Sequence, residues 1–202
     1  MKTARGRLLL LTMAIQLSGW GTANAAGPAF MSTGGRTTQP VGHYEFCLRR
    51  PGECRQMTPK GPPVVLSRKL WAEIVEINNS INTRIKPKTD LENNGVEDYW
   101  TVVDNGFGDC EDYALEKRRE LMSEGVPAGD LLMTVVRLPS GDGHAVLTVR
   151  TSLGEFILDN LDSRVLSFAD TDYTYLKRQS TENSGVWVTI NEGSADVVGS
   201  VR

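Results

Sequence analysis

The spacing of apolar residues predicts an amphipathic helix early in the chain. After Ser67, a residue that can cap a helix, apolar side chains recur at intervals of four, three and four residues, at Leu70, Ile74, Ile77 and Ile81. These side chains fall on one helical face. We therefore expect a helix over about 67–83 that packs against a core.

The pattern predicts a second helix over about 110–123. Ala114, Leu115 and Leu121 form its apolar side. Gly125 stands where a helix C-terminus commonly takes a left-handed residue, and Pro127 follows it.

The second half of the chain has the composition of β-strands. The predicted strands span 131–138, 144–150, 155–160 and 186–190. Helices come first and strands later, so the fold class is α+β, with the helices packed on a sheet.

The remaining segments are expected to be irregular. They are a flexible mature N-terminus (26–42), an irregular segment (43–63), a polar loop (86–108) and a frayed tail (192–202). The pattern does not place 161–185. We expect one domain over 43–191.

The first 25 residues have the layout of a secretory signal peptide. Three positive residues precede a short apolar run over 8–17, and the tripeptide that ends at Ala25 offers a small-residue cleavage site. The run is shorter than the ~20 residues that a membrane-spanning helix needs, so an uncleaved anchor is the weaker interpretation. We expect a periplasmic protein.

Composition and charge narrow the class of protein. The chain has 202 residues, of which 40% are hydrophobic and 23% charged, values that fit one globular domain and exclude a coiled coil or a disordered chain. Its net charge is −3, and removal of the three positive residues in 1–25 makes it −6. An acidic chain of this kind argues against nucleic-acid binding.

The chain has three cysteines, Cys47, Cys54 and Cys110. The first two flank a Pro-Gly turn signal, and an oxidising compartment favours a disulfide between them, with two buried thiols as the alternative. Zinc is less favoured, because only His43 and His144 could add nitrogen ligands. Cys110 is left outside the disulfide, which invites a functional explanation.

Cys110 lies at the first turn of the second predicted helix. Backbone N–H groups and the helix dipole stabilise an anion there, so this position favours a nucleophilic thiolate. A base must accept the thiol proton, and His144, which opens a strand after a glycine-rich loop, is better placed than His43.

Register arithmetic places Asp159 near His144. If Thr151 pairs with Gly154, then Asp159 faces Val146, and His144 lies diagonal to it on the same face. The sequence thus supports a triad of Cys110, His144 and Asp159. Taken singly, His144 could be a strand-edge histidine and Asp159 a turn residue.

Three carboxylates surround Cys110, namely Asp109, Glu111 and Asp112. Their charge disfavours a thiolate, and calcium, which prefers oxygen ligands, would cancel the repulsion. We therefore predict a calcium site formed by Asp109 and Glu111, with Asp112 or loop carbonyls as further ligands. Alternatively, Asp109 and Asp112 cap the helix, or the acids face solvent.

Several motifs together resemble the bacterial transglutaminase-like cysteine proteinases. They are Gly-Asp-Cys-Glu-Asp-Tyr over 108–113, Gly-His-Ala over 143–145, Leu-Asp-Asn over 158–160, Asp-Tyr-Trp over 98–100 and the segment of Cys47 and Cys54. The resemblance covers about 43–190. It implies a papain-like, transglutaminase-like fold with the helices on an antiparallel sheet.

The resemblance also implies roles and partners. Cys110 would be the nucleophile, His144 the base and Asp159 the group that orients the imidazole, with Asp109 and Glu111 binding calcium. The best-known relative is a periplasmic protease that cuts a giant surface adhesin and is sequestered by a membrane receptor for cyclic-di-GMP. This chain departs from it in a long polar N-terminus, so the adhesin and the receptor do not transfer automatically.

The sequence therefore predicts an exported calcium-dependent cysteine endopeptidase. Two alternatives stay open. The same triad could pass its acyl group to an amine instead of water, or the domain could be a non-catalytic, calcium-stabilised binding module.

Overall fold

The computed structural model describes residues 27–191. The expected signal peptide (1–25) and the expected tail (192–202) lie outside the described residues. Within 27–191, no helix combines the length and the apolar character needed to cross a membrane.

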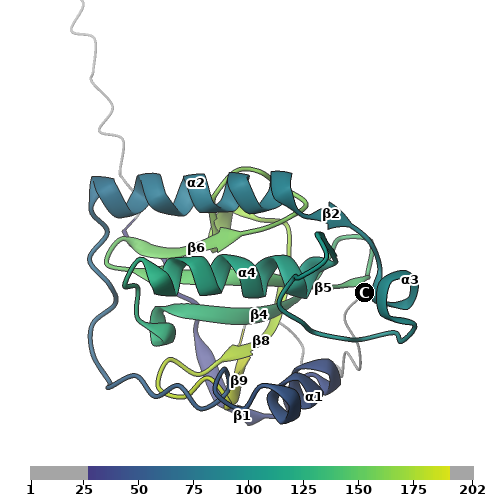
Figure 1. Ribbon diagram of the computed structural model, residues 1–202. Helices are drawn as coiled ribbons and strands as arrows, with labels where there is room; N and C mark the ends of the chain where they lie inside the picture. The colour runs from purple at the N-terminus through teal and green to yellow at the C-terminus, as the bar shows by residue number, and fades with distance from the viewer. Residues whose placement is uncertain (1–26, 192–202) are drawn as a thin grey trace, which may run out of the picture.

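Four α-helices and a large sheet form the described part of the chain (Figure 1). The helices are α1 (Val41–Arg49), α2 (Arg68–Arg84), α3 (Asp90–Asn94) and α4 (Cys110–Ser123), with short 3-10 turns at Ala128–Asp130 and Phe168–Asp170.

The sheet has seven strands in the order β1-β9-β8-β4-β5-β6-β7, and every neighbouring pair is antiparallel. Its strands are β1 (Thr33–Thr37), β4 (Leu131–Arg137), β5 (Gly143–Thr151), β6 (Gly154–Leu158), β7 (Leu166–Ser167), β8 (Thr174–Gln179) and β9 (Trp187–Ile190). A small parallel pair, β2 (Lys86–Pro87) and β3 (Phe107–Gly108), lies apart from it.

The two long helices form where the periodicity predicts them. Ser67 caps α2 by accepting a hydrogen bond from the Leu70 N–H at 3.1 Å, and the predicted stripe faces inward. α4 ends at Ser123, and Gly125 takes a positive φ of 92°, as a C-terminal glycine does.

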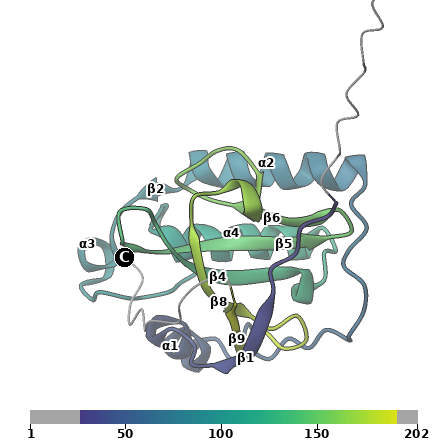
Figure 2. The ribbon, with the colours of Figure 1, turned by 180° about the vertical axis from the view of Figure 1, so that it is seen from behind.

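Both faces of the sheet are covered. α2 and α4 lie side by side over one face, where the main hydrophobic core forms (Figure 1). On the other face, residues 27–32 run across the strands, and Met31 joins a second core with Val146 and Ile157 (Figure 2). The α+β prediction with helices on an antiparallel sheet is confirmed.

Part of the expected flexible N-terminus is ordered. Within 26–42, β1 pairs with β9, and α1 begins at Val41. Gly34 makes the pairing possible, because a Cβ there would lie 2.4 Å from Thr189 Oγ1. A strand rich in glycine carries a weak local signal, and pairing with a neighbour decides its conformation.

Three other expectations need correction. The segment 43–63 begins with most of α1 instead of being irregular throughout. The loop 86–108 contains α3, whose N-terminus has a capping box formed by Thr89 and Glu92. The unplaced region 161–185 supplies β7 and β8.

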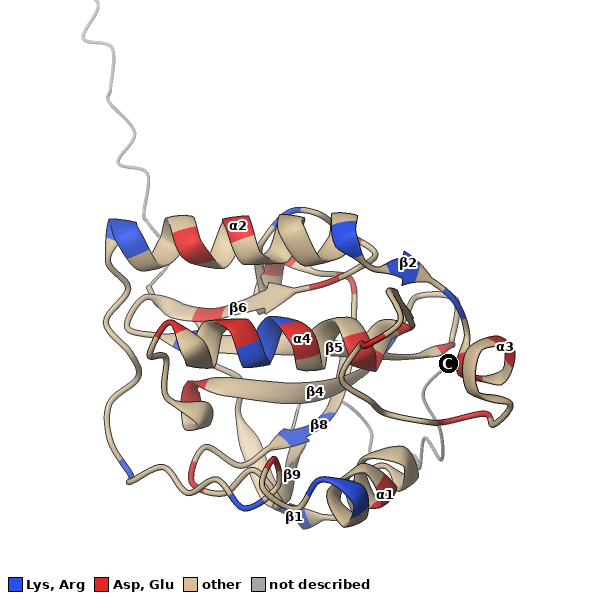
Figure 3. Cartoon of the chain, viewed as in Figure 1, with Lys and Arg blue, Asp and Glu red and all other residues tan. Residues whose placement is uncertain are grey.

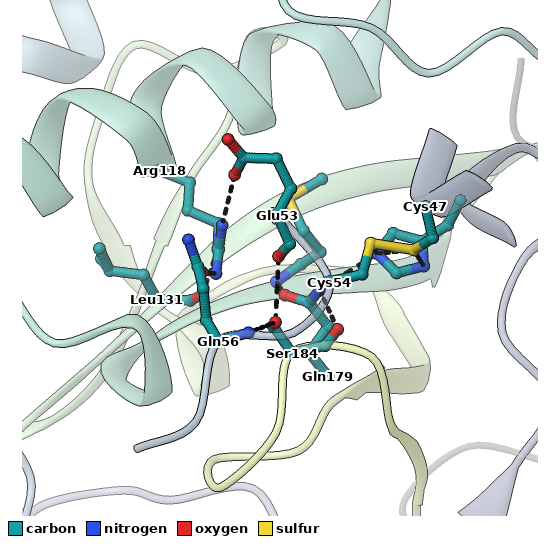
Figure 4. Close-up of polar contacts among 10 residues, drawn as sticks. Cys47, Glu53, Cys54, Gln56, Arg118, Leu131, Gln179 and Ser184 are labelled. Carbon is teal, nitrogen blue, oxygen red and sulfur yellow. Dashed lines mark hydrogen bonds and ion pairs between the residues drawn. A yellow bond between two sulfur atoms is a disulfide. The ribbon is translucent and has the colours of Figure 1, made fainter. Parts of the chain in front are cut away.

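The disulfide between Cys47 and Cys54 is present, as predicted. The loop that it closes is tied to the core (Figure 4). Arg118 on α4 lies 3.6 Å from a Glu53 carboxylate oxygen, and the Ser184 hydroxyl donates to the Glu53 carbonyl at 3.0 Å. The loop therefore fixes α1 against the helix that begins at Cys110.

Candidate active site

The sulfur of Cys110 lies at the start of α4 and against the sheet. Cys110 is 4% exposed, and its thiol donates to Glu111 Oε2 at 3.2 Å. Burial raises the pKa of this thiol well above its usual range, and the charges of Glu111 and Asp109 raise it further. A hydrogen bond from the Ala145 N–H opposes the rise, which places the sulfur beside the residue that follows His144.

The register of β5 and β6 is the one predicted from the sequence, with Thr151 opposite Gly154 and Leu147 opposite Leu158. As a result, His144 Nε2 lies 2.8 Å from Asp159 Oδ1. Both side chains are buried. Since an ionised carboxylate can only accept, Nε2 carries the proton and Nδ1 is left as the ring's acceptor.

A cleft at the start of α4 is lined by both Cys110 and His144. The same cleft is also lined by Lys88, Thr89 and Leu161. The two residues that the sequence singled out therefore line one cleft, and both are almost fully buried in its wall.

Asp159 is held by residues that the sequence analysis did not identify. Tyr173 donates to Asp159 Oδ2 at 2.5 Å, and the Leu161 N–H donates to Oδ1 at 2.9 Å. Asn82 on α2 donates to the Asp159 carbonyl at 2.7 Å. Tyr173 belongs to the region that the sequence left unplaced, and only the inward position of Asn82 on α2 could have hinted at its role.

The predicted metal ligands lie in a larger acidic cluster at the start of α4, near α3 (Figure 3). Asp109 and Asp112 group with Asp90, and Glu111 groups with Asp90 and Asp98. Within each group, the ligand atoms lie within 4.8 Å of one another. Asp90 thus joins all three predicted residues.

Asp90 and Asp98 were not predicted as ligands. Asp90 lies in the first turn of α3, where an acidic residue is common for local reasons. The Asp98 carboxylate accepts hydrogen bonds from the Gly42 N–H and from the Trp100 indole N–H, each at 2.8 Å. The motif that contains Asp98 contributed only to the family resemblance. Asp109 stands at the N-cap of α4, as the capping alternative expects, but its side chain makes no capping hydrogen bond.

The cluster has the electrostatics of a cation site. Burial raises the pKa of Asp112 to about 8 and, together with the Asp90 charge, that of Asp109 to about 6. The pKa of Glu111 also rises well above its usual range, first through burial and then through Asp109. Asp109 Oδ1, Glu111 Oε1 and Asp112 Oδ2 are buried without a hydrogen-bond partner in the described part of the chain.

These observations fit calcium. Unpartnered buried carboxylate oxygens are costly unless a cation compensates them, and calcium prefers six to eight such hard oxygen ligands. The alternative in which these acids face solvent is contradicted for Glu111 and Asp112, both 0% exposed.

His43 lies away from this site. It packs edge-on against Trp100 and Trp187 beside the disulfide, and burial lowers its pKa to about 3. It is therefore a neutral core residue and not a second candidate for the base.

The antiparallel sheet, the cysteine at a helix start, and the histidine on β5 paired with the carboxylate that follows β6 fit the papain-like, transglutaminase-like class of cysteine peptidases. Residues 33–195 match the bacterial transglutaminase-like cysteine proteinase family, BTLCP. The chain belongs to this family.

Solved structures of Legionella pneumophila LapG are similar to this chain. The calcium-bound form has 28% sequence identity and a TM-score of 0.51, over 64% of this chain and 76% of that one. The EGTA-treated form has 29% identity and a TM-score of 0.50, over 59% and 67%. No curated protein sequence matches.

Proposed function

We propose that this protein is an exported, calcium-dependent cysteine endopeptidase that uses Cys110, His144 and Asp159. The observation that carries the proposal is the hydrogen bond between His144 and Asp159 beside a cleft that Cys110 also lines. Membership of a cysteine proteinase family supports it.

In the proposed reaction, the sulfur of Cys110 attacks a substrate carbonyl carbon while His144 Nδ1 takes up the thiol proton. The Cys110 backbone N–H stabilises the oxyanion. His144 then protonates the leaving amine as the C–N bond breaks, which leaves a thioester. Water hydrolyses the thioester with His144 as base, and Asp159 keeps the ring oriented throughout.

Asp109, Glu111 and Asp112 would hold calcium, with Asp90 and Asp98 as the additional candidates from the structure. When bound, the ion would supply positive charge that offsets the carboxylates around the thiol. The similarity to a calcium-bound LapG supports this assignment.

The proposal also includes a cellular location and partners for the protein. The sequence of residues 1–25 supports export to the periplasm. A protein substrate follows from the peptidase family. The resemblance to adhesin-processing proteases favours a large secreted adhesin as that substrate and a cyclic-di-GMP receptor in the inner membrane as a regulator.

The first test uses the full chain with a library of unstructured peptides, and mass spectrometry detects new termini. We expect the wild type to cleave and Cys110→Ala to lose cleavage while keeping its melting temperature, because only the sulfur is removed. Tyr44→Phe, at an exposed position on α1, is the control and should cleave like the wild type. Cleavage by Cys110→Ala would overturn the assigned nucleophile.

The same library separates the alternatives. In EGTA, cleavage by the wild type should fall at least tenfold, and added calcium should restore it. Amine addition to glutamine side chains in the presence of a primary amine would favour transamidation instead. If neither reaction occurs with calcium present, the binding-module alternative is favoured.

A further inference from the structure

The carboxylate of Asp159 has more contacts than the pairing with His144 requires. Its Oδ1 accepts from His144 at 2.8 Å and from the Leu161 N–H at 2.9 Å. Its Oδ2 accepts from the Tyr173 hydroxyl at 2.5 Å. Each oxygen therefore has its own donors, and the plane of the carboxylate is fixed.

Tyr173 also contacts the histidine itself. The rings of His144 and Tyr173 meet edge to face, with centroids 6.0 Å apart and an interplanar angle of 72°. One side chain thus fixes the carboxylate through its hydroxyl and packs against the imidazole through its ring.

We propose that Tyr173 is a positioning residue of the active site, which holds Asp159 and His144 in the geometry that proton transfer needs. This inference rests on the proposed function, because it assigns Tyr173 a part in the same reaction. Tyr173 lies beyond Asp159, outside the set of cleft-lining residues that includes Cys110, and so acts through other residues.

The surroundings of Tyr173 explain why a hydroxyl is needed there. A second cleft is lined by Asp159, Tyr173 and Asp162 and does not include Cys110 among its lining residues. At this cleft, the Tyr173 hydroxyl is the hydrogen-bond donor to Oδ2. Burial and the Asp159 charge raise the pKa of Tyr173, so it remains a donor at every working pH.

Loss of the hydroxyl should change both orientation and proton affinity. Without it the carboxylate can rotate, which misaligns the imidazole. The carboxylate also keeps more of its negative charge and holds the His144 Nε2 proton more tightly. Other charged groups near this pair are Lys117 on α4 and four residues of the second cleft, and none of them changes in the variants below. These four are Asp162, Arg164, Asp170 and Asp172.

The test compares Tyr173→Phe with Tyr175→Phe, which loses a hydroxyl bonded to Thr171 at 2.8 Å and not to Asp159. For peptide cleavage, we expect Tyr173→Phe to lower kcat roughly tenfold with KM unchanged, since a hydrogen bond to a charged group is lost. The acid limb of its kcat/KM profile should move to higher pH, because the proposed reaction needs a neutral imidazole to accept the thiol proton. Tyr175→Phe should match the wild type in both.

A second measurement does not depend on cleavage. In the Cys110→Ala protein, the low-field proton NMR signal of the His144 Nε2–H, identified by its loss in His144→Gln, should move further downfield in Tyr173→Phe and stay in place in Tyr175→Phe. If the wild type cleaves nothing yet this shift occurs, the proposed function fails and the Tyr173 contact stands.

Two outcomes would overturn the role of Tyr173. One is equal kcat and equal pH profiles in the two variants. The other is a lower melting temperature in Tyr173→Phe with the profile and the NMR signal unmoved, which would make the residue structural only.

Discussion

At the scale of single residues, Lys117 shows how the fold can bury a charge. It lies on α4, is 0% exposed, and its ammonium has no hydrogen-bond partner among residues 27–191. Its Nζ lies 5.9 Å from the centroid of the Tyr113 ring. Burial lowers the pKa of Lys117 to about 7, against the opposing charge of Asp159.

The variant Lys117→Met should therefore stabilise the protein, and by an amount that depends on pH. The folded-state pKa of about 7 lies below the unfolded value of 10.5, so the wild type is penalised fully below pH 7 and recovers stability as the pH rises toward 10.5. We expect Lys117→Met to melt several degrees higher at pH 6, with a smaller gain at pH 9, measured by circular dichroism.

The matched control is Lys60→Met, which removes a lysine from an exposed position and should shift the melting temperature little at either pH. A gain in Lys117→Met that does not change with pH would contradict the lowered pKa and indicate better packing alone.

The residues of the candidate site differ in how visible they are in the sequence. Cys110, His144 and Asp159 could be named because each lies at an element boundary and carries reactive chemistry. Tyr173 and Asn82 could not, because an ordinary tyrosine or asparagine becomes relevant only through the contact that it makes. Asp90 could not be named either. Its position at the start of a helix already explains an acidic residue there, and only the structure shows that it lies beside Asp109.

At the scale of elements, α2 is the clearest case of a locally determined helix. Its cap, its apolar stripe and its length all agree with the sequence pattern. The helix carries Asn82, which holds the Asp159 backbone, so its position also bears on the site.

Replacement of the cap by Ser67→Ala should cost about 1 kcal/mol in the free energy of unfolding, because the Leu70 N–H loses its acceptor. Ser80→Ala, at an exposed position of the same helix, is the control and should cost nothing, since alanine has the higher helix propensity. Equal losses in urea unfolding would show that the cap contributes no stability.

Other elements depend on distant partners. The sequence of β1 is typical of a flexible segment. It forms a strand because its backbone pairs with the edge strand β9. The β5–β6 register, by contrast, could be computed from a short turn and alternating side chains, because a slip by one residue would expose the apolar face.

At the scale of the whole molecule, the acidic cluster joins three separate parts of the chain. Asp90 comes from α3, Asp98 from the loop after it, and the remaining acids from the start of α4. Bound calcium would link these parts and so stabilise the folded state by mass action.

We expect 1 mM calcium to raise the melting temperature of the wild type relative to EGTA, and to do so more at pH 8 than at pH 5.5. The pKa values of Asp109 and Asp112 are raised in the folded protein to about 6 and about 8. Without metal, the folded protein therefore loses stability as the pH rises through these values, because both carboxylates must ionise while buried. Calcium binds the ionised carboxylates, so its stabilising effect is larger at the higher pH. Differential scanning fluorimetry measures both effects.

Asp90→Asn should remove most of the calcium-dependent increase, because Asp90 belongs to both carboxylate groups. Asp172→Asn, an acid outside both groups, should keep the full increase. The calcium assignment fails if the melting temperature is the same in calcium and in EGTA at both pH values.

The sequence by itself predicted the two long helices, the β5–β6 register and the disulfide, and the structure confirms them. It also named Cys110, His144 and Asp159 as the candidate catalytic residues. These are local matters: periodicity, capping, turn length and a seven-residue cysteine separation are all readable over a few turns of chain. Tertiary structure alone decided the β1 pairing, the support of Asp159 by Tyr173 and Asn82, and the inclusion of Asp90 and Asp98 in the acidic cluster. Those contacts join residues far apart in sequence, and their geometry exists only after the loops have closed around α4.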